Sequence, residues 1–323
     1  MRGTAVLIAM AVLVAFTALL AGCGGNGGPV GATGSGVNGV LTGAPRGSTY
    51  APEATTGRIA FVTTREGPYR IHIMNADGSY VLPWVQDGVE PSWSPDGNQI
   101  AFATGQETNW QVAIGARNAA RTILTSTGQN FEPSWSPDGN KIAFTSTRDG
   151  YYQVYVMYRH GGQETRLTDK MSSDGEPCWS PNGQRIAFAS TGSGNYQIYV
   201  MSANGSGKTR LTKNTADDAE PSWSPDGRRI AFTSDRTGLW QIYVMNADGT
   251  AQTRLTTSKG NDEDPCWSYD GKRIAFATDR DARAPGMAMW QIYAMNANGS
   301  QQLRLTSGPE GGQSPAWYGP RRR

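Results

Sequence analysis

A motif that returns about every 44 residues constrains this chain more than any other feature. Each copy carries a tryptophan, as in Glu90-Pro-Ser-Trp-Ser-Pro-Asp-Gly97. The six tryptophans are Trp93, Trp135, Trp179, Trp223, Trp267 and Trp317, and their spacings are 42, 44, 44, 44 and 50 residues. A regular period of this length indicates a repeat architecture, in which each copy is one supersecondary unit.

Each unit contains four short segments rich in β-branched and aromatic residues. In one unit they are the segment ending at Trp223, Ile230-Ala-Phe232, Gln241–Met245 and Thr253–Thr256. The sequences Ser-Pro-Asp-Gly and Asn-Ala-Asp-Gly separate them and favour turns, because proline fixes φ at the first corner and glycine accepts a positive φ. Four antiparallel strands in a unit of this length are typical of a propeller blade. We label them a to d, from the innermost outward.

Five complete units run from Glu90 to Gln313. Residues 57–89 supply strands b, c and d alone, and residues 314–319 supply strand a alone. The sequence therefore predicts an all-β, six-bladed β-propeller of four-stranded antiparallel blades over residues 57–319. Pairing of the N-terminal strands b, c and d with the C-terminal strand a would close the ring and remove its open edge.

These repeats resemble the WD-like repeat of the TolB propeller family. The residues that carry the resemblance are Trp-Ser-Pro-Asp-Gly-x-x-Ile-Ala-Phe and Gln-Ile-Tyr-Val-Met-Asn, and they recur over residues 57–319. The resemblance implies a propeller and a binding role in the bacterial cell envelope. The α/β amino-terminal domain of TolB has no counterpart in residues 24–56, and a lipid anchor would be a further difference from soluble TolB.

The first 22 residues have the pattern of a secretory signal peptide. Arg2 precedes an apolar run from Ala5 to Leu20, and Leu20-Ala21-Gly22-Cys23 follows. This ending resembles a bacterial lipobox, which implies cleavage before Cys23 and lipidation of its sulfur; the alternatives are ordinary secretion and a retained signal anchor. Residues 23–56 contain ten glycines and predict a flexible tether. We expect a protein anchored through Cys23 to the membrane of the cell envelope, facing the periplasm or the exterior.

Composition excludes several classes of function. Net charge is +2, and the only basic run is the tail at residues 320–323, so nucleic-acid binding is not expected. Two histidines and three cysteines are too few for a His- or Cys-based metal centre or a disulfide framework. We predict no cofactor and a monomeric protein.

Strand alternation divides the connections between two faces. The tight a–b and c–d turns share one face, and the variable b–c and d–a connections share the other, which we call the loop face. It includes an insertion at residues 279–289. We assign 19 of the 27 acidic residues and eight basic residues to the loop-face connections, and a surface of one sign attracts basic partners. The alternative is that these acids only solubilise the loops and cap the strand ends.

One acidic position recurs at the start of strand a, around the mouth of the central channel. The ring comprises Glu90, Glu132, Glu176, Glu220 and Asp264, with Ser314 at the sixth place. Five carboxylates could hold Ca²⁺ or a Lys or Arg side chain, because hard cations prefer oxygen ligands. The alternative is that each carboxylate accepts backbone hydrogen bonds at its own blade junction.

An aromatic position recurs at the start of strand c and is occupied by Tyr69, Trp110, Tyr152, Tyr196, Trp240 and Trp290. These side chains could bind a partner or could only pack between blade and loop. With Asp235, Asp279 and Arg283 they form the predicted partner-binding set. We predict the six repeat tryptophans to be wedges between blades, and Cys178 and Cys266 to be buried free thiols near the axis.

No catalytic constellation can be assembled from the sequence. His72 falls in a predicted strand c and His160 in a c–d turn, and no Gly-x-Ser-x-Gly elbow exists. Similar propellers that act as pectin-fragment lyases use several histidines around the axis, which this chain lacks. We therefore predict a module that binds an envelope protein or peptide on its acidic loop face, and no enzyme. The alternatives are a glycan or small-ligand sensor and a degenerate enzyme that uses paired acids such as Asp217 and Asp218.

Overall fold

A computed structural model describes residues 57–64, 69–106, 108–117, 119–169, 171–282, 290–307 and 311–319. All of them lie in one compact unit that spans residues 55–323. The predicted signal peptide, tether and basic tail lie outside the described residues, as do Cys23 and Arg283. Among the described residues there is no helix with the length and apolar character needed to span a membrane.

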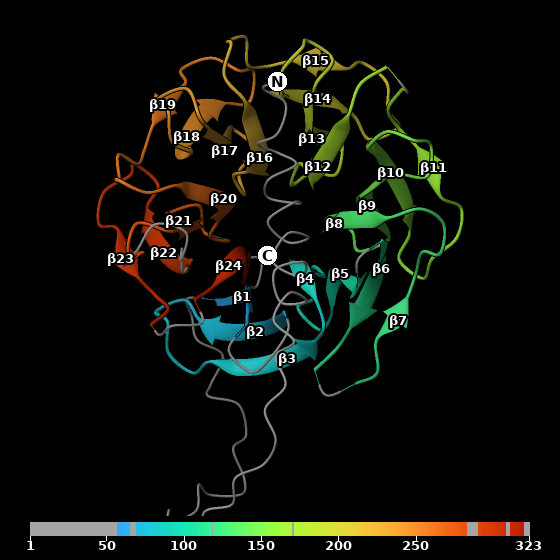
Figure 1. Cartoon of the computed structure of the whole chain (residues 1–323), viewed down its shortest axis with the longest axis horizontal. Helices are drawn as coiled ribbons and strands as arrows, with labels where there is room; N and C mark the ends of the chain where they lie inside the picture. The colour runs from blue at the N-terminus through green and yellow to red at the C-terminus, as the bar shows by residue number, and fades with distance from the viewer. Residues whose placement is uncertain are drawn as a thin grey trace, which may run out of the picture. The chain divides into compact units, whose positions relative to one another are not determined.

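The described strands form six four-stranded antiparallel sheets, arranged as blades around a central axis (Figure 1). From the channel outward, the first three blades contain these strands: blade 1, β24 (Gln313–Tyr318), β1 (Arg58–Thr63), β2 (Arg70–Asn75) and β3 (Leu82–Gln86); blade 2, β4 (Val89–Trp93), β5 (Ile100–Gln106), β6 (Asn109–Gly115) and β7 (Thr122–Ile123); blade 3, β8 (Asn130–Trp135), β9 (Lys141–Ser146), β10 (Gln153–Tyr158) and β11 (Thr165–Arg166).

The remaining blades repeat this order along the chain: blade 4, β12 (Asp174–Trp179), β13 (Arg185–Ser190), β14 (Gln197–Ser202) and β15 (Thr209–Arg210); blade 5, β16 (Asp218–Trp223), β17 (Arg229–Ser234), β18 (Gln241–Asn246) and β19 (Thr253–Arg254); blade 6, β20 (Asp262–Trp267), β21 (Arg273–Thr278), β22 (Gln291–Asn296) and β23 (Leu303–Arg304).

Blade 1 closes the ring by combining both ends of the propeller sequence. The C-terminal strand β24 pairs antiparallel with β1, and Ile59 lies opposite Trp317. This pairing confirms the predicted six-bladed architecture and the predicted mode of closure. In Figure 1, β24 lies between β20 and β4, at the inner position of its blade.

The hydrophobic core lies between neighbouring blades. In one cluster, Val112 and Leu124 of blade 2 pack with Trp135 and Phe144 of blade 3. All six repeat tryptophans are buried in clusters of this kind, which confirms their predicted role as wedges. Burial of such large side chains supplies much of the energy that holds the blades together.

The tight a–b turns form as their residue types predict. In blade 5 the hydroxyl of Ser224 donates to Oδ1 of Asp226 over 2.6 Å and accepts the amide N–H of Arg229 over 2.9 Å. Gly227 then takes a φ of 69°, which a side chain would disfavour. These turns leave the opposite face to the longer connections, and those connections surround the candidate site.

Candidate functional site

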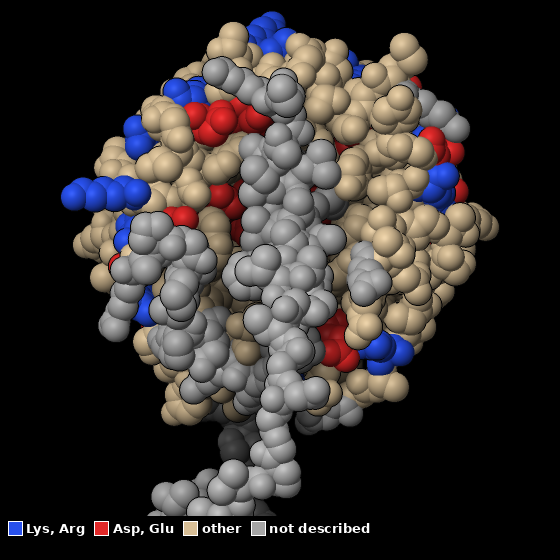
Figure 2. Space-filling model, viewed as in Figure 1, with Lys and Arg blue, Asp and Glu red and all other residues tan. Residues whose placement is uncertain are grey.

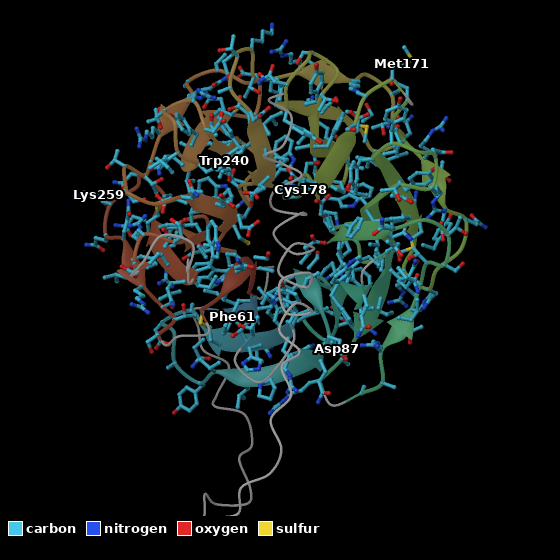
Figure 3. All side chains as sticks on the ribbon, viewed as in Figure 1. Phe61, Asp87, Met171, Cys178, Trp240 and Lys259 are labelled. Atoms are coloured by element: carbon cyan, nitrogen blue, oxygen red, sulfur yellow. The ribbon has the colours of Figure 1, made fainter. Side chains whose placement is uncertain are left out.

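The loop face carries the b–c and d–a connections and the acidic mouth of the channel. Acidic side chains show beside the centre of this face and in patches further out, while Lys and Arg side chains lie mostly toward its rim (Figure 2). Asp87, in the β3–β4 connection, and Trp240, in the β17–β18 connection, are labelled in the same view in Figure 3.

The five predicted ring carboxylates occupy a bulge in each innermost strand. The pairing of strands a and b shifts register at this point, for example between Ala219 and Ser222 in β16. All six ring residues have a positive φ, between 47° for Ser314 and 55° for Glu176 and Asp264. This backbone conformation is unfavourable for residues with a side chain and persists only where surrounding contacts hold it.

The contact that holds each ring residue comes from the neighbouring blade. The Glu90 carboxylate accepts the amide N–H of Glu132 over 2.6 Å, and the Glu132 carboxylate accepts that of Glu176 over 2.8 Å. The series continues from Glu176 to the Glu220 amide, from Glu220 to the Asp264 amide and from Asp264 to the Ser314 amide. Each carboxylate therefore bonds the backbone across a blade junction.

The ring residues are half-buried, and neighbouring ring carboxyls interact electrostatically. Burial and the charge of Glu132 raise the pKa of Glu90 to about 8, and burial together with the charge of Asp264 raises the pKa of Glu220 to about 8. Burial also raises the pKa values of Glu132, Glu176 and Asp264. The ring is therefore partly protonated near neutral pH.

The described residues do not gather three Asp, Glu, His or Cys side chains in an arrangement that could hold a metal ion. One oxygen of each ring carboxylate already accepts a backbone amide N–H. The Thr145 hydroxyl also donates to Glu132, and the Thr233 hydroxyl donates to Glu220. The ring geometry therefore favours the hydrogen-bonding interpretation over the Ca²⁺ interpretation.

The six predicted aromatic residues lie at the start of the third strands, on the same face as the acidic ring. Trp110 is buried and packs on Phe131 of the next blade, with ring centroids 6.2 Å apart, whereas the other five are half-buried. Burial, followed by the charges of Glu176 and Glu132, raises the pKa of Tyr196. Burial and the charge of Glu132 also raise the pKa of Tyr152. Phenol and carboxylate groups thus share the channel mouth.

Asp235 and Asp279, which the sequence places in the partner-binding set, join consecutive blades. The Asp235 carboxylate accepts the amide N–H of Asp217 over 2.9 Å, and Asp217 in turn accepts the amide N–H of Tyr196 over 2.8 Å. Asp279 and Asn261 make the same relay to the amide of Trp240. These carboxylates therefore position the aromatic residues at the channel mouth.

Several charges assigned to the loop face are internal, which the sequence did not reveal. Asp174, Asp218 and Asp262 are fully buried and pair with Lys208, Arg236 and Arg280 over distances of 3.4, 2.9 and 2.8 Å. Arg236 also lies over the rings of Phe232 and Tyr243, with its Cζ atom 5.5 and 4.4 Å from the ring centroids. The pattern Ser-x-Arg after strand b, recurring at Arg148 and Arg236, was the available signal.

The same observation bears on the paired acids. Asp218 is bound to Arg236 inside blade 5, while Asp217 bonds the backbone of Tyr196. The two adjacent aspartates therefore have separate structural roles and do not form a pair of free carboxylates at the axis.

The described cysteines and histidines do not form a cluster that could hold a metal ion. Cys178 and Cys266 are free thiols, as predicted, but they are half-buried rather than buried. Figure 3 places Cys178 close to the centre of the ring. Burial raises the thiol pKa values to about 11 and about 12, which disfavours the nucleophilic thiolate. His72 is buried in β2, whereas His160 is exposed in the β10–β11 turn.

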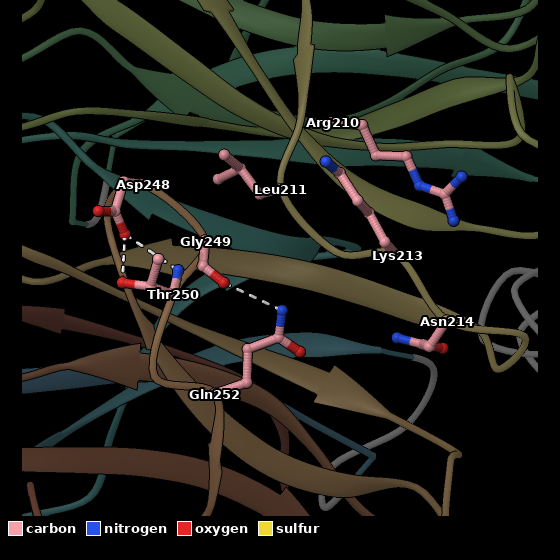
Figure 4. A pocket seen from close by; sticks show the side chains of 8 residues that line it. All are labelled: Arg210, Leu211, Lys213, Asn214, Asp248, Gly249, Thr250 and Gln252. Atoms are coloured by element: carbon pink, nitrogen blue, oxygen red, sulfur yellow. Dashed lines mark hydrogen bonds between the residues drawn. The ribbon is translucent and has the colours of Figure 1, made fainter.

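A separate cavity of about 340 Å³ lies on the outer rim between blades 4 and 5 (Figure 4). Its wall is polar, and its lining residues are Arg210, Leu211, Lys213, Asn214, Asp248, Gly249, Thr250 and Gln252. Asp248 accepts hydrogen bonds from Thr250, and Gln252 donates to the carbonyl of Gly249. The cavity contains no member of the acidic or aromatic rings.

Solved structures with a similar fold include proteins of the TolB type. TolB from Acinetobacter baumannii superposes with a TM-score of 0.71 at 25% identity, covering 82% of this chain and 67% of that one. A putative TolB from Agrobacterium tumefaciens gives a TM-score of 0.62 at 25% identity, covering 80% and 91%. An oligogalacturonate lyase in complex with manganese shares the fold alone, with a TM-score of 0.54 at 13% identity over 77% and 73% of the two chains.

The search of curated proteins by sequence gave no match. The sequence model of the TolB beta propeller domain matches residues 47–216, 175–250 and 220–321. These matches cover all six blades, and the fold and the repeat agree with them. The chain therefore belongs to the TolB beta propeller domain family.

Proposed function

We propose that this propeller is a binding module whose loop face receives a protein or peptide partner. The observation that carries the proposal is the ring of five carboxylates, which lies on the same face as five half-buried aromatic residues and close enough to Tyr152 and Tyr196 to raise their pKa values. Aromatic faces and carboxylates together favour a partner segment that carries cationic and apolar side chains. Exposed apolar residues on the same face, including Tyr151 and Leu239, add contact area.

We also propose that the protein is held at a membrane of the cell envelope by a lipid on Cys23. The support is the lipobox at residues 20–23 and the glycine-rich stretch at residues 24–56. A coil of this length has an r.m.s. span of roughly 30 Å, which would let the propeller reach a partner away from the membrane surface. The similarity to TolB proteins supports an envelope role.

The proposal includes no enzymatic activity. The two described histidines have different environments, since His72 is buried and His160 is exposed in a turn. The thiols of Cys178 and Cys266 have raised pKa values. One oxygen of each ring carboxylate bonds a backbone amide of the next blade, so the ring has a structural role at the joints between blades.

Photo-crosslinking in living cells tests the partner. Tyr151, which is 56% exposed in the β9–β10 connection, is replaced by a photoreactive phenylalanine. The matched control carries the same replacement at Tyr80, which is 68% exposed in the β2–β3 turn on the opposite face. We expect a protein adduct from Tyr151 only. Equal adducts from both positions, or none from either, would contradict a partner site on the loop face.

A glycan ligand is the second candidate, because Trp240 and Tyr196 are half-buried aromatic residues on the loop face and Tyr196 lies near Glu176. A Trp240→Ala variant separates the two candidates. Glycan binding requires the indole surface and would be lost, whereas the adduct at Tyr151 would persist if the partner is a protein held over the whole face.

A further inference from the structure

The junction between blades 1 and 2, which we call the closing junction, differs from the other five. At each of those five, a ring carboxylate accepts the amide N–H of the next blade. Blade 1 has Ser314 at this position, so no ring carboxylate extends from blade 1 toward blade 2.

A second contact near the channel is also missing there. The Ser92 hydroxyl accepts the amide N–H of Trp135 over 3.1 Å, and Cys266 Sγ accepts that of Trp317 over 3.1 Å. Blade 1 has Ala316 at the corresponding place, and an alanine side chain accepts no hydrogen bond. Among the described residues, the closing junction therefore lacks two recurring links near the axis.

Other contacts, made by residues of β24 toward the tight-turn face, replace the two missing links. Trp93 Nε1 donates to the carbonyl of Ala316 over 3.1 Å, whereas the indole N–H groups of Trp135, Trp179, Trp223 and Trp267 have no acceptor in the described part of the chain. The Tyr318 ring lies 5.3 Å from that of Trp93, and the Arg58 guanidinium lies over both rings. The Tyr318 hydroxyl donates to the carbonyl of Asp96 over 3.1 Å.

The Tyr318 ring also occupies the place that the proline of an a–b turn fills at other junctions. Elsewhere the residue after the repeat tryptophan is a serine that holds the a–b turn, and the proline of that turn packs under the glycine of the next one. A Cβ placed on Gly139 would lie 3.6 Å from Pro95, for example. At the closing junction the Tyr318 ring fills this place, because a Cβ on Gly97 would lie 2.2 Å from its Cζ atom.

A second tyrosine flanks the same blade on its other side. Tyr269 of blade 6 stands where blades 2 to 5 have Pro95, Pro137, Pro181 and Pro225. Its ring lies against Gly57 at the start of β1 and Gly319 at the end of β24, where added Cβ atoms would come within 3.2 and 2.0 Å of it. The two departures from the repeat thus occur on either side of the blade whose strands a and b have no covalent turn.

We propose that Tyr318 and Tyr269 form a clamp that keeps β24 seated in blade 1. The clamp offsets both the missing a–b turn and the two missing links at the closing junction. It goes beyond the binding function, because it determines whether the ring stays closed. Without it, β24 would leave its place beside β1 before any other blade opens.

The test compares variants of the full-length protein, purified in mild detergent. Tyr318→Ser installs the residue that the other five blades carry, and Tyr318→Phe keeps the stacking but removes the hydroxyl. Tyr158→Ser is the matched control, because Tyr158 is 46% exposed at the end of β10. We expect Tyr318→Ser to lower Tm by about 4–8 °C, and Tyr318→Phe and the control to lower it by less than about 3 °C.

Hydrogen exchange locates the effect. In Tyr318→Ser we expect amides of β24 and β1 to exchange about tenfold faster, with blades 3 to 5 unchanged. Adding Ala316→Ser, which restores the missing acceptor for the Trp93 amide, should recover part of the loss. Uniform acceleration over all blades, or a Tm change equal to that of Tyr158→Ser, would overturn the proposal. If Tyr318→Ser does not fold, Tyr269→Pro supplies the same comparison, and unchanged exchange at β24 would then refute the clamp.

Discussion

At the scale of single residues, each ring carboxylate residue has an unfavourable positive φ and makes a hydrogen bond to the backbone of the next blade. Their recurrence was predicted from the repeat, as was their position at the channel. Their positive φ could not be predicted, because glutamate is not a residue type that favours it. The reason lies in the next blade, whose amide each carboxylate bonds, and a single unit of sequence contains no information about that contact.

The ring makes stability depend on pH. The folded-state pKa of Glu220 is raised from 4.5 to about 8, so the folded protein binds more protons than the unfolded chain between these values. Stability therefore falls as pH rises through this window and levels off above it. We expect Glu220→Gln, which keeps an oxygen acceptor without the charge, to raise Tm by about 2–4 °C at about pH 8 and to change it little at about pH 5.

Differential scanning calorimetry at both pH values measures this effect. Asp248→Asn is the control, because a hydrogen bond from Thr250 lowers the Asp248 pKa and its carboxyl stays ionised throughout the window. An equal Tm change in Glu220→Gln at the two pH values would show that the ring carboxyl does not titrate in this range.

At the scale of the blade, strand order and turns were predictable, whereas the internal ion pairs were not. The alternation of apolar segments and Ser-Pro-Asp-Gly turns gave all four strands of each unit. Asp218 and Arg236 were placed in loops, because charged residues between strands usually remain exposed. Instead Asp218 begins β16 and is fully buried, and the Arg236 guanidinium folds back across the blade to reach it.

Loss of the cation from this pair should be costly. We expect Arg236→Ala to reduce the free energy of unfolding by about 3–5 kcal/mol, because Asp218 is left buried without its partner. Combining it with Asp218→Asn should recover at least half of the loss. Urea denaturation measures both effects. The comparison is Arg121→Ala, whose pair with Asp87 is 42% and 56% exposed and should contribute no more than about 1 kcal/mol.

At the scale of the whole molecule, the repeat count fixed the ring and its closure, but sequence alone did not separate surface charge from internal charge. Three buried aspartates pair with basic side chains inside the blades, and the ring carboxyls have raised pKa values, so the acidic loop face owes its charge mainly to the remaining loop acids. The partners of each pair belong to the same blade but lie 18 or 34 residues apart in the sequence, which explains why local sequence patterns were insufficient.

Charge on the loop face should control the rate of association. We expect Asp87→Asn with Asp169→Asn, both exposed loop-face residues, to slow association with the protein captured through Tyr151 by about two- to fivefold at low salt. The difference should vanish at about 500 mM salt, where screening is nearly complete. Asp77→Asn with Asp248→Asn makes the same charge change on the opposite face and should have no effect. Stopped-flow fluorescence measures the rates, and equal slowing by both pairs would contradict a loop-face partner.

Closure of the ring through β24 has a consequence for how the protein folds during its synthesis. Strand β1 is among the first made and its partner β24 is the last, so blade 1 waits for almost the entire propeller before it can be completed. During that time β1 presents an unpaired edge, and long-range pairings of this kind form slowly. A chain cut short anywhere before β24 would keep the edge exposed for good. The fold thus distinguishes a chain that includes β24 from one that stops before it, and the shorter chain would be exposed to proteases and to aggregation.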